Sequence, residues 1–323
     1  MRILLLIAVL MLPALQSAAD PIRFARAESM LSLPILLAET NGYFADEGVD
    51  VTFVTTLVGK RSIEKLLSGE ADLAVGGTPP VVRQLLDKKP LCIVSNLTES
   101  DNTQKIISSR QSGIRLPEDL LGKRIGLPFG TGADYGFREF MVFNALTKDD
   151  LELVNIRPAQ LVKGLSKNNI DTLVLWEPLA NQVKSVLGED YQLVAGSENM
   201  LLEYPIVTRP ETARKRHAEL VKILRALQRA NRFAIEKRAE TIQITAQRLQ
   251  LEQAQAEEFL DDHLYRLAIS PRLLHALERI AEMMLADDNS RKKIPDFSHS
   301  FCQQALLEVA PDNDLLKYTG GGQ

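Results

Sequence analysis

The segment KRIGLPFGTGADYGFREFMVFNAL, residues 123–146, contains the alternation that decides the fold. A short apolar run comes first, a glycine-rich loop follows it, and a stretch with apolar residues at helical spacing ends the segment. This order predicts a strand, a loop and a helix. Because parallel strands need such crossover helices, repetition of the order indicates an α/β protein.

The same alternation extends from about residue 20 to about residue 199. Its first series has strand-like runs at 22–27, 49–55, 71–77 and 91–97, with helix-length segments between them. A polar stretch, ESDNTQ at 99–104, interrupts the pattern, which then resumes from residue 123 to 195. Two series separated by a polar break predict two α/β lobes, each a mostly parallel sheet flanked by helices.

The remainder of the chain is predicted to be helical. Residues 211–238 read as one long amphipathic helix, and LLHALERIAEMMLA at 273–286 reads as another.

The N-terminus has the features of a cleavable signal peptide. Arg2 precedes a short apolar run, and QSAAD places small residues before Asp20. The run is short for a membrane span and no cysteine follows it. We therefore expect residues 1–19 to be removed and the protein to be exported to the periplasm without a lipid anchor.

Charge and cysteine content narrow the possible partners. The chain has 38 Lys and Arg against 42 Asp and Glu, without a dense basic patch, which argues against nucleic acid. Cys92 lies in the apolar run PLCIVSNL, so we expect a buried small hydrophobe. Pairing with Cys302 is the alternative that an oxidising compartment leaves open. No metal-site spacing occurs, and neither a metal nor a cofactor is expected.

Three loops between a strand and a helix carry glycine, a hydroxyl or an aromatic residue: GGTPP at 76–80, PFGTGAD at 128–134 and WEP at 176–178. In an open parallel sheet, ligands gather outside the carboxyl ends of strands, where helix N-termini offer free N–H groups. These loops therefore predict a ligand cleft with walls in both lobes.

Four segments resemble extracytoplasmic solute-binding proteins of the nitrate, sulfonate and taurine group of ABC importers. They are NGYFADEGVDVTF (41–53), LLSGEADLAVGGTPPV (66–81), LLGKRIGLPFGTGADY (120–135) and DTLVLWEPLA (171–180). Their order and spacing resemble that family from about Ile22 to Gly188.

The resemblance implies a type II periplasmic binding protein fold. Lobe one would comprise residues 20–98 and 205–323, and lobe two residues 99–204, with hinge crossings near 97–104 and 200–206. Such proteins close on a small-molecule ligand and present it to an inner-membrane ABC permease with its ATPase. We expect such a protein to be a monomer and not an enzyme.

Candidate ligand residues follow from the loops and the resemblance. The first lobe would contribute Glu28, Ser29, Met30, Leu31, Gly77 and Thr78. The second would contribute Gly130, Thr131, Gly132, Ala133, Asp134, Trp176 and Glu177. For Trp176 we favour a flat wall of the cleft over a core position.

Several of these residues have a second interpretation. Thr131 and Asp134 have the spacing of a capping box, Glu177 precedes a helix that it could cap, and Glu28 could be a solvated acid. If Glu28, Asp134 and Glu177 all faced the cleft, with Arg26 the only base nearby, a bare anion would be repelled. That arrangement favours a small organic ligand with a polar or nitrogenous group over nitrate.

Two other functions share the same fold expectation. One is a sensory module that hands its closed form to a receptor or signalling enzyme. The other resembles thiamine-pyrimidine synthases, but that chemistry needs a cleft histidine and a cysteine-rich motif, which we do not identify in the sequence.

Overall fold

The computed structural model describes residues 20–312, apart from 167–168, 198–199, 289 and 291. The predicted signal peptide at 1–19 lies outside the described residues. None of the described helices combines the length and the apolar character needed to cross a membrane.

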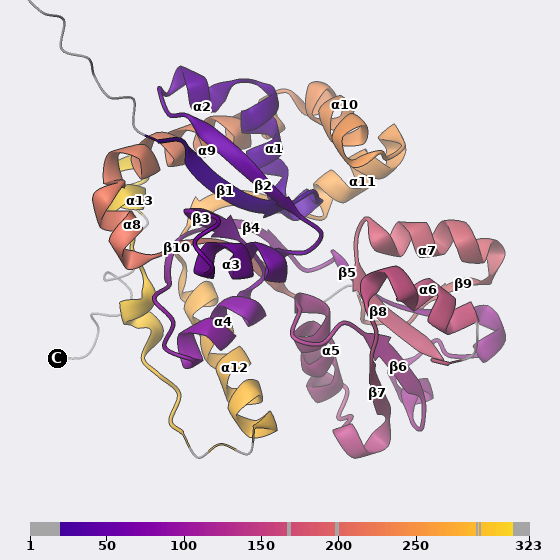
Figure 1. The fold of residues 1–323 in the computed structure, drawn as a ribbon. Helices are drawn as coiled ribbons and strands as arrows, with labels where there is room; N and C mark the ends of the chain where they lie inside the picture. The colour runs from indigo at the N-terminus through magenta and orange to yellow at the C-terminus, as the bar shows by residue number, and fades with distance from the viewer. Residues whose placement is uncertain (1–19, 167–168, 198–199, 289, 291, 313–323) are drawn as a thin grey trace, which may run out of the picture.

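A six-stranded sheet forms one half of the molecule, in the order β11-β4-β10-β3-β1-β2 (Figure 1). Its strands are β1 (Ile22–Ala27), β2 (Val51–Thr56), β3 (Leu73–Val75), β4 (Cys92–Ser100), β10 (Leu202–Thr208) and β11 (Leu264–Ala268). β1 is parallel to β2 and β3, whereas β10 is antiparallel to β3 and β4, and β11 is antiparallel to β4.

A five-stranded sheet forms the other half, in the order β7-β6-β8-β5-β9. Its strands are β5 (Gln104–Ser109), β6 (Arg124–Leu127), β7 (Glu152–Asn155), β8 (Thr172–Trp176) and β9 (Tyr191–Leu193). β6 is parallel to β7 and β8, while β5 is antiparallel to β8 and β9.

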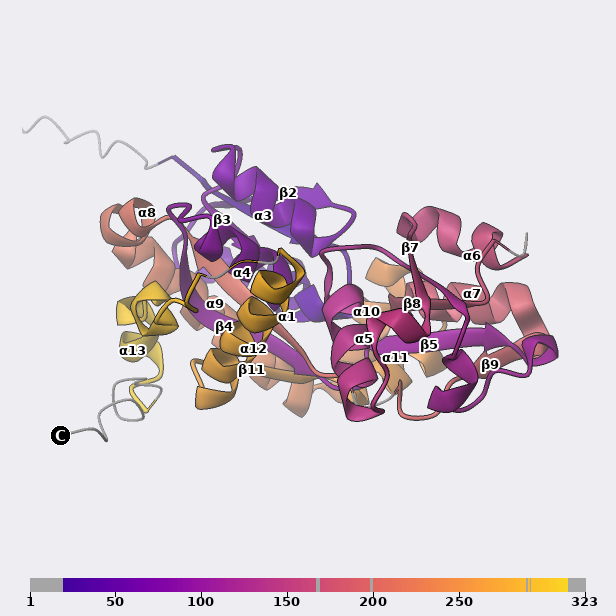
Figure 2. The ribbon, with the colours of Figure 1, turned by 90° about the horizontal axis from the view of Figure 1, so that it is seen from below.

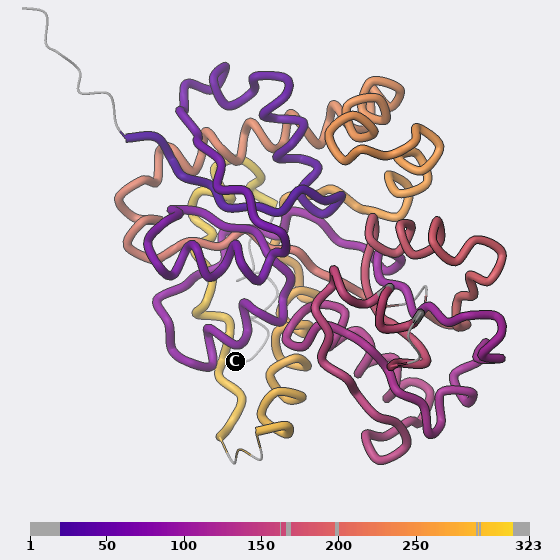
Figure 3. The backbone as a smooth tube through the Cα atoms, turned by 45° about the vertical axis from the view of Figure 1, so that its right-hand side comes forward, coloured from indigo at the N-terminus to yellow at the C-terminus, as the bar shows by residue number. Residues whose placement is uncertain are grey.

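Both sheets are therefore mixed, which corrects the expectation of mostly parallel sheets. The chain leaves the first sheet along β4 and returns along β10, so these neighbouring strands must run in opposite directions (Figure 3). β5 also runs against its neighbours, and neither β5, β10 nor β11 was predicted as a strand.

Each face of the first sheet packs against its own helices. Alternation along β3 directs Leu73 and Val75 into a core with α1 (Leu33–Thr40) and α9 (His217–Glu236). Ala74 faces a second core with α3 (Gly59–Leu67), α4 (Thr78–Leu86) and α12 (Pro271–Asp287). The short α2 (Tyr43–Asp46), α8 (Pro210–Lys215) and α13 (Gln304–Val309), together with α10 (Arg238–Leu249) and α11 (Gln253–Asp261), complete this half.

The second sheet is also covered on both faces. Ile106 lies in a core with α5 (Gly132–Phe143), and the next residue, Ile107, lies in a core with α6 (Pro158–Ser166) and α7 (Leu179–Leu187). Trp176 packs against both cores because it stands at the end of β8. The two halves lie side by side, with the five-stranded sheet and its helices at the right of both views (Figures 1 and 2).

The predicted long helix at 211–238 is interrupted. α8 ends at Lys215 and α9 begins at His217, because Arg216 leaves the helical conformation with φ −113° and ψ 30°.

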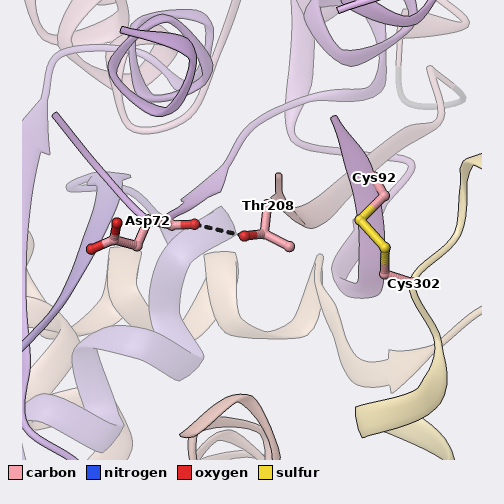
Figure 4. Close-up of a disulfide and its surroundings, with 4 residues drawn as sticks. All are labelled: Asp72, Cys92, Thr208 and Cys302. Carbon is pink, nitrogen blue, oxygen red and sulfur yellow. Dashed lines mark hydrogen bonds between the residues drawn. A yellow bond between two sulfur atoms is a disulfide. The ribbon is translucent and has the colours of Figure 1, made fainter. Parts of the chain in front are cut away.

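Cys92 and Cys302 form a disulfide, which corrects the prediction of a lone buried cysteine (Figure 4). Cys92 is buried as expected, but the C-terminal segment runs beside β4, where Cys302 N donates to Ile93 O at 2.8 Å. Close by, Thr208 Oγ1 donates to Asp72 O at 2.7 Å and ties β10 to the start of β3 (Figure 4). The crosslink joins positions 210 residues apart, a pairing that local sequence could not reveal.

Candidate ligand-binding site

A cavity of about 530 Å³ lies between the two halves, a volume typical of small-molecule sites. The carboxyl ends of β1, β2 and β3 reach it from the first sheet, through the loops at residues 27–31, 57–60 and 77. The ends of β6 and β8 reach it from the second sheet, through residues 131–133 and 176–179. The predicted position of the cleft, outside the carboxyl ends of strands, is where this cavity lies.

Three helices begin at the cavity without a side-chain cap. Val58, Gly77 and Thr131 are the N-cap residues of α3, α4 and α5, and none of these helices has a hydrogen bond from its N–H groups to the side chain of its N-cap residue. The first N–H groups of a helix have no partner within the helix and carry partial positive charge. Pro79 and Pro80 have no N–H, so Thr78 is the only one of the first three residues of α4 that can donate. The backbone donors at the cavity therefore come mainly from the first turns of α3 and α5.

Close approach of two loops requires glycine on the first-sheet side. A Cβ on Gly59 would lie 2.5 Å from Tyr204 Oη, and a Cβ on Gly76 would lie 2.8 Å from Gly59 O. Since real Cβ atoms do not approach so closely, these two glycines set the distance between the starts of α3 and α4.

The structure brings together many of the predicted site residues. Those that line the cavity are Glu28, Ser29, Leu31, Gly77, Thr131, Gly132, Ala133 and Trp176.

Met30, Thr78 and Gly130 do not line the cavity. Met30 is fully buried in the core because the 3-10 turn at Met30–Ser32 directs its side chain inward. Thr78 Oγ1 donates to Glu203 O at 2.9 Å. Gly130 adopts φ 71°, and its N–H donates to Asp134 Oδ2 at 2.8 Å.

Asp134 also faces away from the cavity. The capping box that Thr131 and Asp134 could form at the start of α5 is not present. Asp134 Oδ1 accepts from Arg138 Nε at 2.7 Å and its other oxygen holds the Gly130 N–H. Thr131 Oγ1 donates to Pro128 O at 2.7 Å and so does not cap α5. Asp134 thus fixes the loop backbone, and Thr131 meets the cavity at the start of the helix.

Glu177 follows the capping interpretation. It is buried, and its Oε2 accepts from Asn181 N at 3.0 Å in the first turn of α7. Burial raises the pKa of the Glu177 carboxyl to about 7, since removal from water disfavours its charged form.

The charge around the cavity differs from the sequence-based expectation. Neither Asp134 nor Glu177 lines it, whereas Lys60 and Arg248 do. Arg26 is only 1% exposed and lies behind the wall, where Nη1 donates to Glu28 Oε1 at 2.5 Å. The premise of three uncompensated acids is therefore wrong.

Glu28 belongs to a compact ion cluster. Arg26 and Arg248 both pair with Glu28 and with Glu39, at 2.5–3.3 Å. Two arginines and two glutamates balance in charge, so Glu28 is not the solvated acid of its alternative interpretation.

The polar lining residues that the sequence analysis missed include Lys60, Gln104, Tyr204 and Arg248. Lys60 had a signal, because TTLVGKRS at 55–62 is a further loop between a strand and a helix, and it contains a glycine. Gln104 is the last residue of the polar stretch at 99–104 and begins an unpredicted strand, and Arg248 lies in the last turn of a helix far along the chain. Nothing local in the sequence marked either residue.

The cavity also has an extensive apolar surface. Leu31, Leu202 and Leu249 line it from the first half and the returning chain, and Trp176 and Leu179 line it from the second sheet. A ligand with an oxygen-rich head and a carbon skeleton matches this combination of donors and apolar side chains.

Within residues 20–312 as described, no three His, Cys, Asp or Glu side chains gather in a way that could hold a metal ion.

Comparison with known proteins finds a family model, related sequences and similar solved structures. A sequence model of the family described as NMT1/THI5 like matches residues 30–241. A putative binding protein from Brucella abortus (strain 2308) is 22% identical over 224 residues, which are 68% of this chain and 69% of that protein. The taurine-binding periplasmic protein of Escherichia coli (strain K12) is 25% identical over 187 residues, 58% of this chain and 53% of that protein.

The periplasmic aliphatic sulphonate binding protein SsuA from Escherichia coli has a similar solved structure. It superposes with a TM-score of 0.76 at 16% identity, covering 89% of this chain and 99% of that one. This likeness confirms the predicted fold class, an α/β fold of two lobes.

Proposed function

The chain belongs to the NMT1/THI5-like family, and from this premise we propose that it is the solute-binding component of an ABC importer. Its ligand is a small organic anion, with a head group of the sulfonate type and a short carbon skeleton. The protein acts in the periplasm after removal of residues 1–19, as a monomer that delivers the ligand to a membrane permease and its ATPase.

One observation carries this proposal: three uncapped helix N-termini from both sheets meet at one cavity beside apolar side chains. The backbone N–H groups suit the several oxygens of an oxyanion, and Lys60 and Arg248 add positive charge. Trp176 and the leucines suit the carbon skeleton. Relatives named for taurine and for aliphatic sulphonates support a sulfonate-type head.

Two stretches of chain join the halves, one between β4 and β5 and one between β9 and β10. We propose that residues 20–98 and 205–323 move as one lobe against 99–204, because only these two connections must bend when the cleft closes. Ligand that bridges the N-termini of α3 and α5 would stabilise the closed form.

A ligand screen tests the binding function. Purified residues 20–323 are heated with sulfonates, sulfate, nitrate, pyrimidines and amino acids, and a ligand at a hundred times its Kd adds about 2.7 kcal/mol of stability. Small-angle scattering should then show a smaller radius of gyration with the stabilising ligand. A screen in which no sulfonate raises the melting temperature contradicts the proposed ligand class.

Two further measurements separate import from the alternatives. An importer requires that deletion of the gene lowers cellular uptake of the ligand, whereas a sensor leaves uptake intact. An enzyme converts the ligand, so recovery of unchanged ligand after long incubation, checked by mass spectrometry, is the expected result.

A further inference from the structure

Helix α5 has two faces, and each packs against a different half of the molecule. Ala133, Phe137 and Phe140 belong to the core of the second half, which contains the five-stranded sheet. Tyr135, on the other face, is buried in the core that α4 and α12 form in the first half, which contains the six-stranded sheet. The helix that begins at the cavity is therefore also a contact between the two halves (Figures 1 and 2).

Ion pairs join this second face of α5 to α12. Arg279 Nη2 of α12 lies 3.0 Å from Glu139 Oε1 of α5. Arg138 Nη1 of α5 donates to Asp287 Oδ2 of α12 at 2.7 Å, and Lys148 of the second half pairs with the other oxygen of Asp287. Each helix contributes a basic and an acidic side chain, so the charges of the two helices are complementary.

The α5 side of this contact is largely shielded from water. The side chains of Arg138 and Glu139 are 12% and 13% exposed, and that of Asp287 is 24% exposed. Opposite charges attract more strongly where water is scarce, and like charges repel more strongly there. The contact should therefore be more sensitive to a change of charge than an ion pair on an open surface.

Arg138 connects this contact to the cavity wall. Its Nε donates to Asp134 Oδ1 at 2.7 Å, while its Nη1 holds Asp287. The other oxygen of Asp134 accepts from Gly130 N at 2.8 Å, and the next residues, 131–133, line the cavity. The loop at the start of α5 is thus held by a chain of contacts that begins on α12 in the opposite half.

The two walls also meet directly in this arrangement. Lys60 Nζ, on α3 of the first half, donates to Phe129 O of the second half at 3.4 Å. The chain connections between the halves can act as a hinge, so other contacts must decide which rotation about them is preferred. The ion pairs between α5 and α12 are suited to that role because they join the halves at residues that do not line the cavity.

We propose that the ion pairs between α5 and α12 hold the two halves in the arrangement in which both cavity walls can contact one ligand. This inference rests on the proposed function, because it makes Glu139, Arg279 and Asp287 positioning residues for ligand binding. They act through the orientation of α5 and do not touch the ligand. Loss of the pairs favours a wider arrangement of the halves and weakens binding.

Charge reversal of one pair tests the inference. Arg279→Glu places two acids opposite each other, and its combination with Glu139→Arg restores opposite charges in exchanged positions. Small-angle scattering without added ligand should give a larger radius of gyration for the single variant and a value close to wild type for the double variant. Lys89→Glu, at an exposed position of the first half, changes the net charge equally and is the control.

Titration calorimetry with 2-aminoethanesulfonate as the probe measures the effect on binding. Arg279→Glu should raise the Kd at least about fivefold, and the double variant should recover most of this loss. Melting curves of all variants report folding. A merely structural role would lower the melting temperature and leave the radius of gyration and the Kd of the folded protein at their wild-type values.

Three results overturn the inference: an unchanged radius of gyration in Arg279→Glu, tighter binding by that variant, or a double variant as impaired as the single one. If the probe does not bind the wild type, the proposed ligand class fails, but the scattering comparison still decides the inference. If Arg279→Glu does not fold, Asp287→Asn takes its place in the same measurements, because it removes the negative charge that faces Arg138 and Lys148.

Discussion

The two walls of the cavity use their acidic side chains in opposite ways. On the second-sheet side, Asp134 and Glu177 turn away and accept backbone N–H groups beside the helices that they precede or begin. On the first-sheet side, Glu28 lines the cavity, and Arg26 and Arg248 both donate to its Oε1. Asp134 thus fixes the loop before its helix, Glu177 caps the helix that follows it, and Glu28 is held by basic side chains.

The largest expected effect is on the free energy of unfolding, and it concerns the two sheets that support the cavity walls. The six-stranded sheet contains the only disulfide that two cysteines allow, and the five-stranded sheet has none. Replacing Cys92 and Cys302 by serine should lower the free energy of unfolding by about 2–5 kcal/mol. Urea unfolding with and without reductant measures this loss.

The ligand Kd of this double variant should change little, because neither cysteine lines the cavity. An unchanged unfolding midpoint, or a reductant effect that persists in the serine variant, would contradict the assignment of the stability to the crosslink.

The next largest effect is the pH dependence of stability that the buried carboxyl of Glu177 should cause. The pKa of Glu177 is about 7 in the folded protein against an ordinary value of 4.5. Its protonated form therefore favours folding, a contribution complete below about pH 4.5 and lost as the pH rises through 7.

Glu177→Gln keeps an acceptor for the Asn181 N–H and carries no charge at any pH. At pH 8 we expect it to be more stable than the wild type by an amount on the order of 2 kcal/mol. At pH 4.5 the two should be alike. Chemical unfolding across this pH range measures the difference, and Glu189→Gln, an exposed acid of the same half, is the control. A parallel pH profile for both proteins would refute the buried-acid assignment.

A smaller effect tests the apolar contribution of the second wall. Trp176→Ala should raise the ligand Kd about tenfold, since a flat aromatic face against the carbon skeleton is lost. Trp176→Phe keeps a flat face and should stay within about threefold of the wild type. Calorimetry with the ligand from the screen gives both values. If wild type and a folded Trp176→Ala variant had equal Kd, Trp176 would not contribute to ligand binding and its role would be structural only.

The smallest effect tests an exposed cation of the first wall. Lys60→Met should weaken anion binding by about 0.2–1 kcal/mol, because water and salt screen an exposed charge. Its Kd should also depend less on ionic strength than that of the wild type. Lys65, on the same helix, pairs with Glu70 away from the cavity, so Lys65→Met should leave both quantities unchanged.

The fold class and part of the site could be predicted from the sequence for the same reason. The alternation of apolar runs and helical segments is local, and it places loops at the carboxyl ends of strands. Loops at residues 27–31, 77 and 131–133 reach the cavity from these positions. Individual side chains were harder, because Met30, Thr78 and Asp134 share those loops and point elsewhere.

The sequence by itself determined the repeated strand, loop and helix, and therefore the edge of each sheet at which a ligand can bind. Only the tertiary structure decided what faces the cavity there. Arg248 reaches Glu28 across 220 residues, and Cys302 reaches Cys92 across 210. Periodicity reports which face of an element is buried, but the partner on that face depends on where the chain returns. The return along β10 and the helices after it brings in Arg248, which holds one oxygen of Glu28 and leaves the other without a partner.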